Sequence, residues 1–281
     1  MHRKGAAHGR GTGRKRTIIA VDMASAKDTI EKNPDETADE ILDAGIVVLQ
    51  KKRGYRFSID ALLLTHFVRI RKGAWIVEFG TGSAVIAMVI AKRYPTAVVH
   101  ALEIQPQIAD MARRSVEANG LLDRVTIHNE DARAVTKLFT ERRFDAAVFN
   151  PPYRKRNSGR INPAREKAVA RHEIAGSLSL FLDAAGSIVT RGASVYTIYP
   201  ARRCVDLITA MRAQKIEPKR MRMVHSHIGS RAEFVMVEGI KGAGEEMSVM
   251  PPLFLYRETN VYSEEMNAIF RELATFPARD G

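Results

Sequence analysis

The central part of the chain alternates between short apolar runs and longer segments whose apolar residues recur at helical spacing. The apolar runs have the length of strands and fall at residues 74–79, 97–102, 125–128, 144–149 and 194–199. The intervening segments predict helices at residues 84–94, 107–119, 133–141 and 202–214, with another inside 172–189. Strands that alternate with helices form a mostly parallel sheet covered on both faces. The predicted fold class is therefore α/β, with a Rossmann-like sheet.

The two ends of this series follow different patterns. Apolar runs at residues 221–225 and 233–240 are separated only by a turn, which predicts an antiparallel hairpin at the sheet edge and seven strands in all. Upstream, the acidic residues 35–43 are compatible with a helix and lead into an apolar run at 46–49 and a basic turn at 51–54. We expect this upstream segment to form a short cap that contains a hairpin.

These patterns divide the chain into four segments. We predict a disordered basic tail at 1–34, an N-terminal cap at 35–72, the Rossmann-like domain at 73–242 and a C-terminal extension with weak periodicity at 243–281. The tail is rich in glycine and lacks the apolar stretch of a secretory signal. We hypothesise that the natural start is Met23, where ordinary sequence begins.

Composition narrows the class of protein. With 45% apolar and 27% charged residues the chain resembles globular proteins, and its longest apolar stretch, 84–91, is too short to span a bilayer. Cys204 is the only cysteine, which excludes a disulfide within the chain and a zinc site built from cysteines, so a reducing cytoplasm is expected. The net charge of +12 predicts a polyanion partner, because neutralising phosphates drives affinity.

A glycine-rich turn follows the first strand of the series. Gly80 and Gly82 let the backbone turn sharply between a strand and a helix, although Ala84 stands where dinucleotide binders prefer glycine. Glu103 ends the next strand, at a spacing where a carboxylate accepts hydrogen bonds from both hydroxyls of a ribose. Asp131 follows the third strand and either lies near an adenine ring or caps a helix. This half of the chain fits a nicotinamide dinucleotide or S-adenosylmethionine.

The fourth strand decides between these cofactors, because it ends in Asn150-Pro151-Pro152-Tyr153. This turn offers a side-chain carbonyl, a backbone carbonyl without a competing N–H, and a ring that stacks on a flat substrate. An amino nitrogen conjugated to a ring is a poor nucleophile until acceptors hold its hydrogens, and two prolines keep such acceptors rigid. An ordinary turn is the simpler interpretation. Together with the glycine turn, however, the motif predicts methylation of a planar amino group, which needs no metal and no acid/base pair.

With these motifs the chain resembles the class I S-adenosylmethionine-dependent methyltransferases that methylate amino groups. More narrowly, it looks like the bacterial family that methylates the exocyclic amino group of the adenine next to the anticodon of valine tRNA. The resemblance covers roughly residues 39–262 and includes the segments 54–61, 78–83, 103–105, 144–153, 170–173, 217–220, 224–225 and 237–242.

The resemblance implies S-adenosylmethionine as cofactor and tRNA as partner, with a role for each matching residue. The cofactor would be held by Phe57, Asp60, Glu78, Gly80, Thr81, Gly82, Glu103, Ile104, Asp131, Ala132 and Asn150. Within this set, Glu78 and the glycines would hold the methionine part, Glu103 the ribose and Asp131 the adenine. The target base would be held by Asn150, Pro151, Pro152 and Tyr153. Phe57 and Asp60 would close over the cofactor, although a helix start with an N-terminal acid explains them as well.

The segment after this motif, residues 154–171, carries seven Lys and Arg against the single acid Glu166. We hypothesise that it orders on tRNA phosphates while the adenine swings out to stack on Tyr153. A solvated basic loop is the simpler alternative. The cations expected to bind RNA are Arg154, Lys155, Arg156 and Arg160.

Other functions use the same motifs. A glutamine side chain of a peptide-chain release factor is also a planar amide, but enzymes that methylate it usually bring a helical N-terminal module, and only a short segment precedes the first shared motif here. Another RNA target, such as a ribosomal adenine, is a further alternative. The non-enzyme alternative is a catalytically silent RNA-binding module, against which the intact cofactor and catalytic motifs argue.

Overall fold

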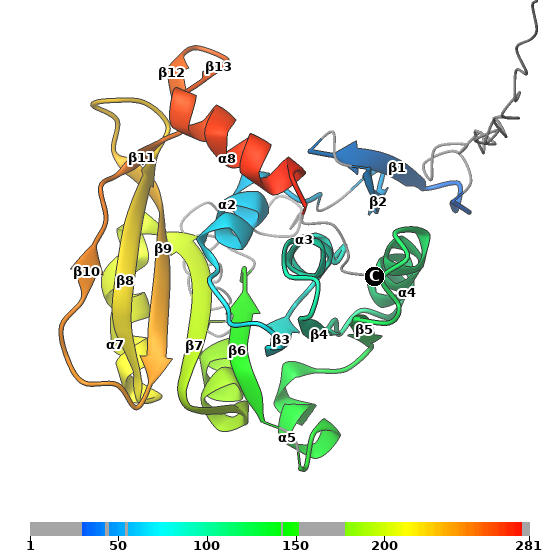
Figure 1. Cartoon of the computed structure of the whole chain (residues 1–281), viewed down its shortest axis with the longest axis horizontal. Coiled ribbons are helices and arrows are strands. Elements are labelled where there is room, and N and C mark those ends of the chain that lie inside the picture. Colours follow the sequence, from blue (N-terminus) through cyan, green and yellow to red (C-terminus); the bar gives the residue numbers. More distant parts are fainter. Residues whose placement is uncertain (1–29, 43–44, 54–55, 142, 152–177, 277–281) are drawn as a thin grey trace, which may run out of the picture.

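A computed structural model describes residues 30–42, 45–53, 56–141, 143–151 and 178–276, and its centre is one mixed sheet (Figure 1). Seven of its strands follow the order β8-β9-β7-β6-β3-β4-β5. They are β3 (Trp75–Phe79), β4 (Val98–Leu102), β5 (Val125–His128), β6 (Phe144–Phe149), β7 (Val189–Pro200), β8 (Ile216–His225) and β9 (Ala232–Lys241). Among these seven, β9 alone runs antiparallel to its neighbours, β7 and β8. The predicted fold class and the antiparallel hairpin are confirmed.

Helices cover both faces of the sheet, as the alternating pattern predicts. They are α2 (Ile59–Phe67), α3 (Val85–Arg93), α4 (Pro106–Ala118), α5 (Val135–Leu138), α7 (Cys204–Ala213) and α8 (Glu264–Ala274), with a further helix over 178–188. Successive residues of a strand enter different cores because their side chains alternate between the two faces. Thus Ala146 and Val148 of β6 pack with α2, α3, α4 and α8, whereas Ala147 and Phe149 pack with the 178–188 helix and α7.

Two predicted helices begin or end differently from the sequence pattern. The helix expected at 133–141 is reduced to a 3₁₀ turn, Ala132–Ala134, followed by the single turn of α5. Phe139 leaves helical geometry there and packs edge-on against Phe144, with 5.0 Å between ring centroids. The helix expected at 202–214 likewise starts with a 3₁₀ turn, Ala201–Arg203, before α7.

The C-terminal residues add to the sheet in a way that their weak periodicity did not predict. Two short strands, β10 (Ser248–Val249) and β11 (Leu253–Phe254), pair in parallel with β8 and bring the sheet to nine strands. A small hairpin of β12 (Tyr256–Glu258) and β13 (Val261–Tyr262) then leads into α8. Strands of two residues are too short to show an alternating pattern, so the sequence carries no signal for them.

The N-terminal cap contains a hairpin, but its first strand corrects the sequence interpretation. The acidic residues 35–43, read as compatible with a helix, instead form β1 (Glu36–Ile41), which pairs antiparallel with β2 (Ile46–Lys51). The hairpin turn lies between the two strands and not at the basic residues 51–54. Pairing with the apolar β2 and burial of Ala38 beside Met111 of α4 outweigh the low strand propensity of Asp and Glu.

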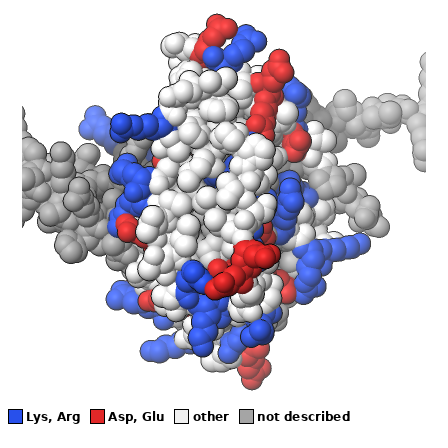
Figure 2. Space-filling view, turned by 90° about the vertical axis from the view of Figure 1, so that its left-hand side faces the viewer, with Lys and Arg blue, Asp and Glu red and all other residues white. Residues whose placement is uncertain are grey.

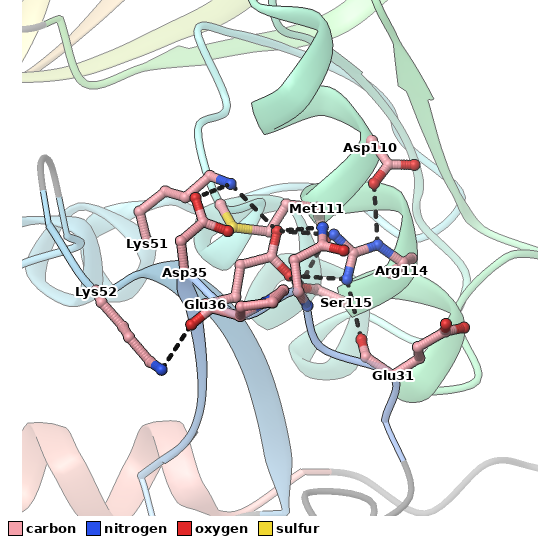
Figure 3. A network of polar contacts seen from close by, with 11 residues as sticks. Glu31, Asp35, Glu36, Lys51, Lys52, Asp110, Met111, Arg114 and Ser115 are labelled. Atoms are coloured by element: carbon pink, nitrogen blue, oxygen red, sulfur yellow. Dashed lines mark hydrogen bonds and ion pairs between the residues drawn. The ribbon is translucent and has the colours of Figure 1, made fainter.

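A polar network joins this hairpin to α4 (Figure 3). The fully buried side chain of Glu36 accepts hydrogen bonds from both terminal nitrogens of Arg114, at 3.0 and 2.9 Å. Asn33 donates to the same carboxylate through its backbone and side chain, each at 3.0 Å. Arg114 also reaches Asp110 at 3.0 Å, one helical turn away. The acid that looked like a helix former therefore serves as the anchor of the hairpin.

The free edge of β2 is satisfied by side chains of α4 and of Asn119, the residue that follows this helix. Ser115 accepts the N–H of Leu49 through its hydroxyl at 2.9 Å. Asn119 exchanges two hydrogen bonds with the backbone of Val47, at 3.0 and 2.6 Å. Buried backbone groups need partners, and here a helix supplies them where a third strand otherwise would. Within the described residues, no helix is long and apolar enough to cross a membrane.

The Glu36–Arg114 contact predicts how stability depends on pH. Burial opposes ionisation of Glu36, but hydrogen bonds from Arg114 and Asn33 outweigh it and lower its pKa from 4.5 to about 2. A carboxyl group whose pKa is lower in the folded state stabilises the fold above its unfolded pKa and loses this contribution as the pH falls toward the folded value. We expect Glu36→Gln to lower the free energy of unfolding by about 3 kcal/mol at pH 7, with the difference from wild type shrinking between pH 5 and pH 2.

Urea unfolding of both proteins at several pH values measures this difference. The control is Asp110→Asn, because Asp110 pairs with the same arginine from an exposed position and should change stability by about 0.5 kcal/mol or less. A loss in Glu36→Gln that stays constant from pH 7 to pH 2 contradicts the assignment.

Candidate functional site

Four parallel strands end level with one another at one edge of the sheet. Phe79, at the end of β3, is the direct register partner of Leu102 on β4 and of Phe149 on β6. Leu102 is in turn the partner of His128 on β5. The residues that follow these strand ends therefore gather at the carboxyl edge, where open α/β sheets bind their ligands. The predicted site residues of the glycine turn, of the next two strands and of Asn150 are brought together there.

The turn after β3 requires glycine for two physical reasons. Gly80 and Gly82 have φ values of 67° and 58°, in the left-handed region that favours glycine. A Cβ on Gly80 would also lie 3.0 Å from the ring of Phe181, which stacks on Phe79. Ala84 adopts a φ of 61° at the start of α3, which shows why glycine is preferred at this third position. Alanine in this conformation costs about 1 kcal/mol.

Glu78 is buried directly before this turn. Its side chain accepts a hydrogen bond from the Thr81 hydroxyl at 2.7 Å, and the residue is 2% exposed. Burial, with a smaller contribution from the nearby Glu103 carboxylate, raises the pKa of Glu78 to about 8. A cation placed beside such a group favours its charged form. Glu78 is therefore suited to a positively charged ligand group.

Glu103 ties the end of β4 to the glycine turn. One carboxylate oxygen accepts the N–H of Gly82 at 3.0 Å, and the other accepts the backbone and side-chain N–H groups of Gln105 at 3.0 and 3.1 Å. The residue is 5% exposed, so its carboxylate is held in one orientation. Next to it, Ile104 has 57% of its surface exposed. A fixed acceptor beside an exposed apolar side chain is an arrangement that can bind a ribose and a flat ring.

Asp131 takes the capping role that the sequence left open. Its side chain accepts the N–H of Arg133 at 2.8 Å and thereby caps the 3₁₀ turn. The side chain of Arg133 adds contacts at 3.0 and 2.5 Å, and these hydrogen bonds lower the pKa of Asp131. Ala132 is buried beside it. Contact of Asp131 and Ala132 with an adenine ring stays a prediction.

Asn150 follows β6 and holds the most unusual polar atom of the site. Its Nδ2 donates to the Oδ2 of Asp60 at 3.2 Å. Its Oδ1 is buried and has no hydrogen-bond partner among the described residues. Buried acceptors without a donor are rare and call for an explanation. Pro151 is also buried, whereas Pro152 and Tyr153 lie outside the described residues, as do Arg154, Lys155, Arg156 and Arg160.

The contact between Asp60 and Asn150 was missed by the sequence analysis. Asp60 stands in the first turn of α2, and the sequence assigned it with Phe57 to a segment that closes over the cofactor. In the structure Phe57 is half-buried against the core, and its N–H donates to the buried side chain of Gln50 at 2.9 Å. The available signal was the acid at a helix start, but such an acid gives no indication of which distant residue it meets.

Cationic side chains also occur away from the strand ends. A cavity of about 220 Å³ between α2, α8, β8 and β9 is lined partly by Arg69, Arg93, Arg220 and Arg222. Arg93 binds backbone carbonyls at the end of α2, while Arg220 pairs with Glu238 and Arg222 with Glu265, so these three join elements of the fold. On the face that carries β8, β10 and α7, Lys and Arg lie mostly along the margins of an uncharged strip (Figure 2). Within the described ranges, no group of three or more His, Cys, Asp or Glu could hold a metal ion.

The sheet order, the glycine turn and the acidic strand end define a class I methyltransferase fold. Residues 58–181 match the family model described as the methyltransferase small domain. A structure described as a predicted O-methyltransferase from Agrobacterium tumefaciens superposes with a TM-score of 0.63 at 20% identity, covering 78% of this chain and 99% of that one. The [4+2]-cyclase SpnF matches with a TM-score of 0.51 at 12% identity, over 66% of this chain and 80% of its own. The fold alone therefore does not decide the reaction.

In sequence the chain is similar to tRNA1(Val) (adenine(37)-N6)-methyltransferases, which confirms the resemblance found from its motifs. The relative from Porphyromonas gingivalis is 33% identical over 133 residues, which cover 47% of this chain and 51% of that protein. The relative from Vibrio campbellii is 26% identical over 180 residues, which cover 61% of this chain and 73% of that protein. The relative from Actinobacillus succinogenes is 28% identical over 214 residues, which cover 76% of this chain and 87% of that protein. The chain thus spans about half the length of the first of these relatives.

Burial of Glu78 predicts a second pH dependence, opposite in sign to that of Glu36. An acid whose pKa is higher in the folded state contributes stability below its unfolded pKa and loses it as the pH rises through the folded value. The melting temperature of the free protein should therefore fall as the pH rises from about 5 to 9, and Glu78→Gln should flatten this decline. Thermal unfolding followed by circular dichroism measures both profiles. Parallel profiles for the two proteins contradict the raised pKa.

Proposed function

We propose that this chain is an S-adenosylmethionine-dependent methyltransferase that methylates the exocyclic amino group of an adenine in tRNA. The observation that carries the proposal is the Oδ1 of Asn150 at the carboxyl end of β6, which is buried and has no hydrogen-bond partner among the described residues. An amino group of a planar substrate supplies the missing donor. The similarity to tRNA1(Val) methyltransferases supports tRNA as the substrate, and the adenine next to the anticodon of valine tRNA as the finer target. A tRNA substrate also fits the expected cytoplasmic location.

The residues at the strand ends fit the chemistry of S-adenosylmethionine. The buried carboxyl group of Glu78 suits the ammonium group of the methionine part. The Glu103 carboxylate, held in one orientation at the end of β4, keeps lone pairs for the ribose hydroxyls. Gly80 and Gly82 allow close approach of the backbone, and the exposed Ile104 offers an apolar surface to the adenine. When bound, the cofactor supplies an electrophilic methyl group.

The residues of the chain prepare the nucleophile. The Oδ1 of Asn150 and the carbonyl of Pro151 accept hydrogen bonds from the two N–H groups of the adenine amino group. These bonds draw the nitrogen lone pair out of conjugation with the ring and fix its direction. Because positive charge develops on this nitrogen during the reaction, the two acceptors stabilise the transition state more than the bound substrate. The proton leaves to solvent afterwards. Tyr153 follows in sequence and supplies a face on which the adenine stacks, worth about 1–3 kcal/mol.

The experiment that tests the function is mass spectrometry of the modified nucleosides in tRNA. A strain that lacks the gene should lose N6-methyladenosine that the parent strain contains, and the wild-type gene should restore it. Asn150→Ala should fail to restore it, with turnover reduced about 100-fold and affinity for S-adenosylmethionine within about threefold of wild type. Asn267→Ala on the exposed face of α8 is the control and should restore it fully. Identical nucleosides in the parent and the deletion strain contradict the proposal.

Binding of RNA through the basic segment predicts a specific salt dependence. Replacing Arg154, Lys155 and Arg156 by Gln removes three phosphate contacts, and the slope of log affinity against log salt should become shallower by roughly 2 to 3. Filter binding of unmodified tRNA between 50 and 200 mM salt measures the slope. The control replaces Lys72 and Lys215 by Gln. These two residues precede β3 and β8 and lie at the opposite edge of the sheet. An unchanged slope in the triple variant rejects a role for this segment in RNA binding.

A further inference from the structure

We infer that Asp60 is a positioning residue that decides which atom of the Asn150 amide faces the substrate. The inference rests on the proposed function and goes beyond it, because it assigns a residue from the N-terminal cap to the reaction. The carboxylate of Asp60 accepts a hydrogen bond from the Nδ2 of Asn150 at 3.2 Å. The other amide atom, Oδ1, is then the one that remains buried and without a partner among the described residues.

An asparagine side chain needs such a neighbour because its two ends have nearly the same shape. A half-turn of the amide exchanges an acceptor for a donor without changing the space that it fills. In one orientation Asn150 offers an oxygen to the amino group of the adenine, and in the other it offers an NH2 group, which repels it. An ionised carboxylate only accepts hydrogen bonds. A carboxylate beside Asn150 therefore stabilises the first orientation and opposes the second, in which two oxygens face each other.

Asp60 is itself held firmly enough to act in this way. The residue is 2% exposed, and its Oδ1 accepts hydrogen bonds from the Ser58 hydroxyl and from the N–H of Ala61, the latter at 3.1 Å. Both oxygens of Asp60 thus have defined partners. Oδ1 binds Ser58 and Ala61 in its own turn, and Oδ2 binds Asn150 at the end of β6.

This geometry predicts an unusual consequence of the isosteric change Asp60→Asn. The N–H of Ala61 is a fixed donor, so the new amide must place its oxygen toward Ala61 and its NH2 toward Asn150. Asn150 then has to turn its oxygen toward that NH2 and present its own NH2 to the substrate. We expect kcat to fall about 100-fold, because a favourable acceptor is replaced by a donor. The affinity for S-adenosylmethionine should stay within about threefold, and the melting temperature within about 4 °C.

The decisive variant exchanges the two residues. In Asp60→Asn combined with Asn150→Asp, one oxygen of the new carboxylate accepts from the new NH2, and the other still offers an acceptor to the substrate. We expect kcat at least tenfold above that of Asp60→Asn alone. Asn150→Asp by itself brings two carboxylates within hydrogen-bond distance and should be slower than the double variant. Asp145→Asn, at the far end of β6, makes the same chemical change outside the site and should keep the wild-type kcat.

The orientation can also be measured without any reaction. The side-chain NH2 signals of Asn150, identified by their disappearance in Asn150→Asp, should show nuclear Overhauser effects to the β-protons of Asp60 in the wild-type protein. These effects should be lost in Asp60→Asn. A wild-type protein that shows them but methylates no tRNA contradicts the proposed function and leaves the orientation intact. An Asp60→Asn variant with wild-type kcat, or a double variant slower than Asp60→Asn, overturns the positioning role.

Discussion

The rest of the structure depends on one constraint, which is that four neighbouring strands end in the same register. Because Phe79, Leu102, His128 and Phe149 stand in one register, the turns that follow them emerge side by side. A slip of one residue in any pair would send buried side chains to the opposite face of the sheet. The apolar faces of both cores thus enforce the alignment, and Glu103 adds to it by joining the end of β4 to the glycine turn after β3.

The N-terminal hairpin belongs to the same construction, although it lies outside the main sheet. It is anchored on α4 through Glu36, and through Gln50 it holds the backbone just before α2. That helix start in turn carries Asp60, which reaches Asn150. Side-chain hydrogen bonds, the pairing of β1 with β2 and the chain between residues 57 and 60 therefore connect α4 with the end of β6. The hairpin contacts both α4 and the segment just before α2.

Local patterns in the sequence were sufficient to place the central strands, β3 to β9, and the glycine turn after β3. Residues 125–128 and 144–149 were predicted with the bounds that the structure shows, because each is a run of strand length whose apolar residues are buried in the sheet. Contacts between distant segments were not accessible in this way. Glu36 of β1 finds its partner on α4, Phe181 packs against Gly80, and Asp60 meets Asn150 from 90 positions away. The division into tail, cap, domain and extension stays a prediction.

The placement of β9 has a consequence for how the molecule is made. This strand fills the slot between β7 and β8, yet it follows both of them in the chain. Until the ribosome has released residue 241, the facing edges of β7 and β8 have no strand between them. Unpaired strand edges of this kind can pair with other protein chains and lead to aggregation. The β8–β9 hairpin can form locally and then dock onto β7 as a unit, after which β10 and β11 add to β8.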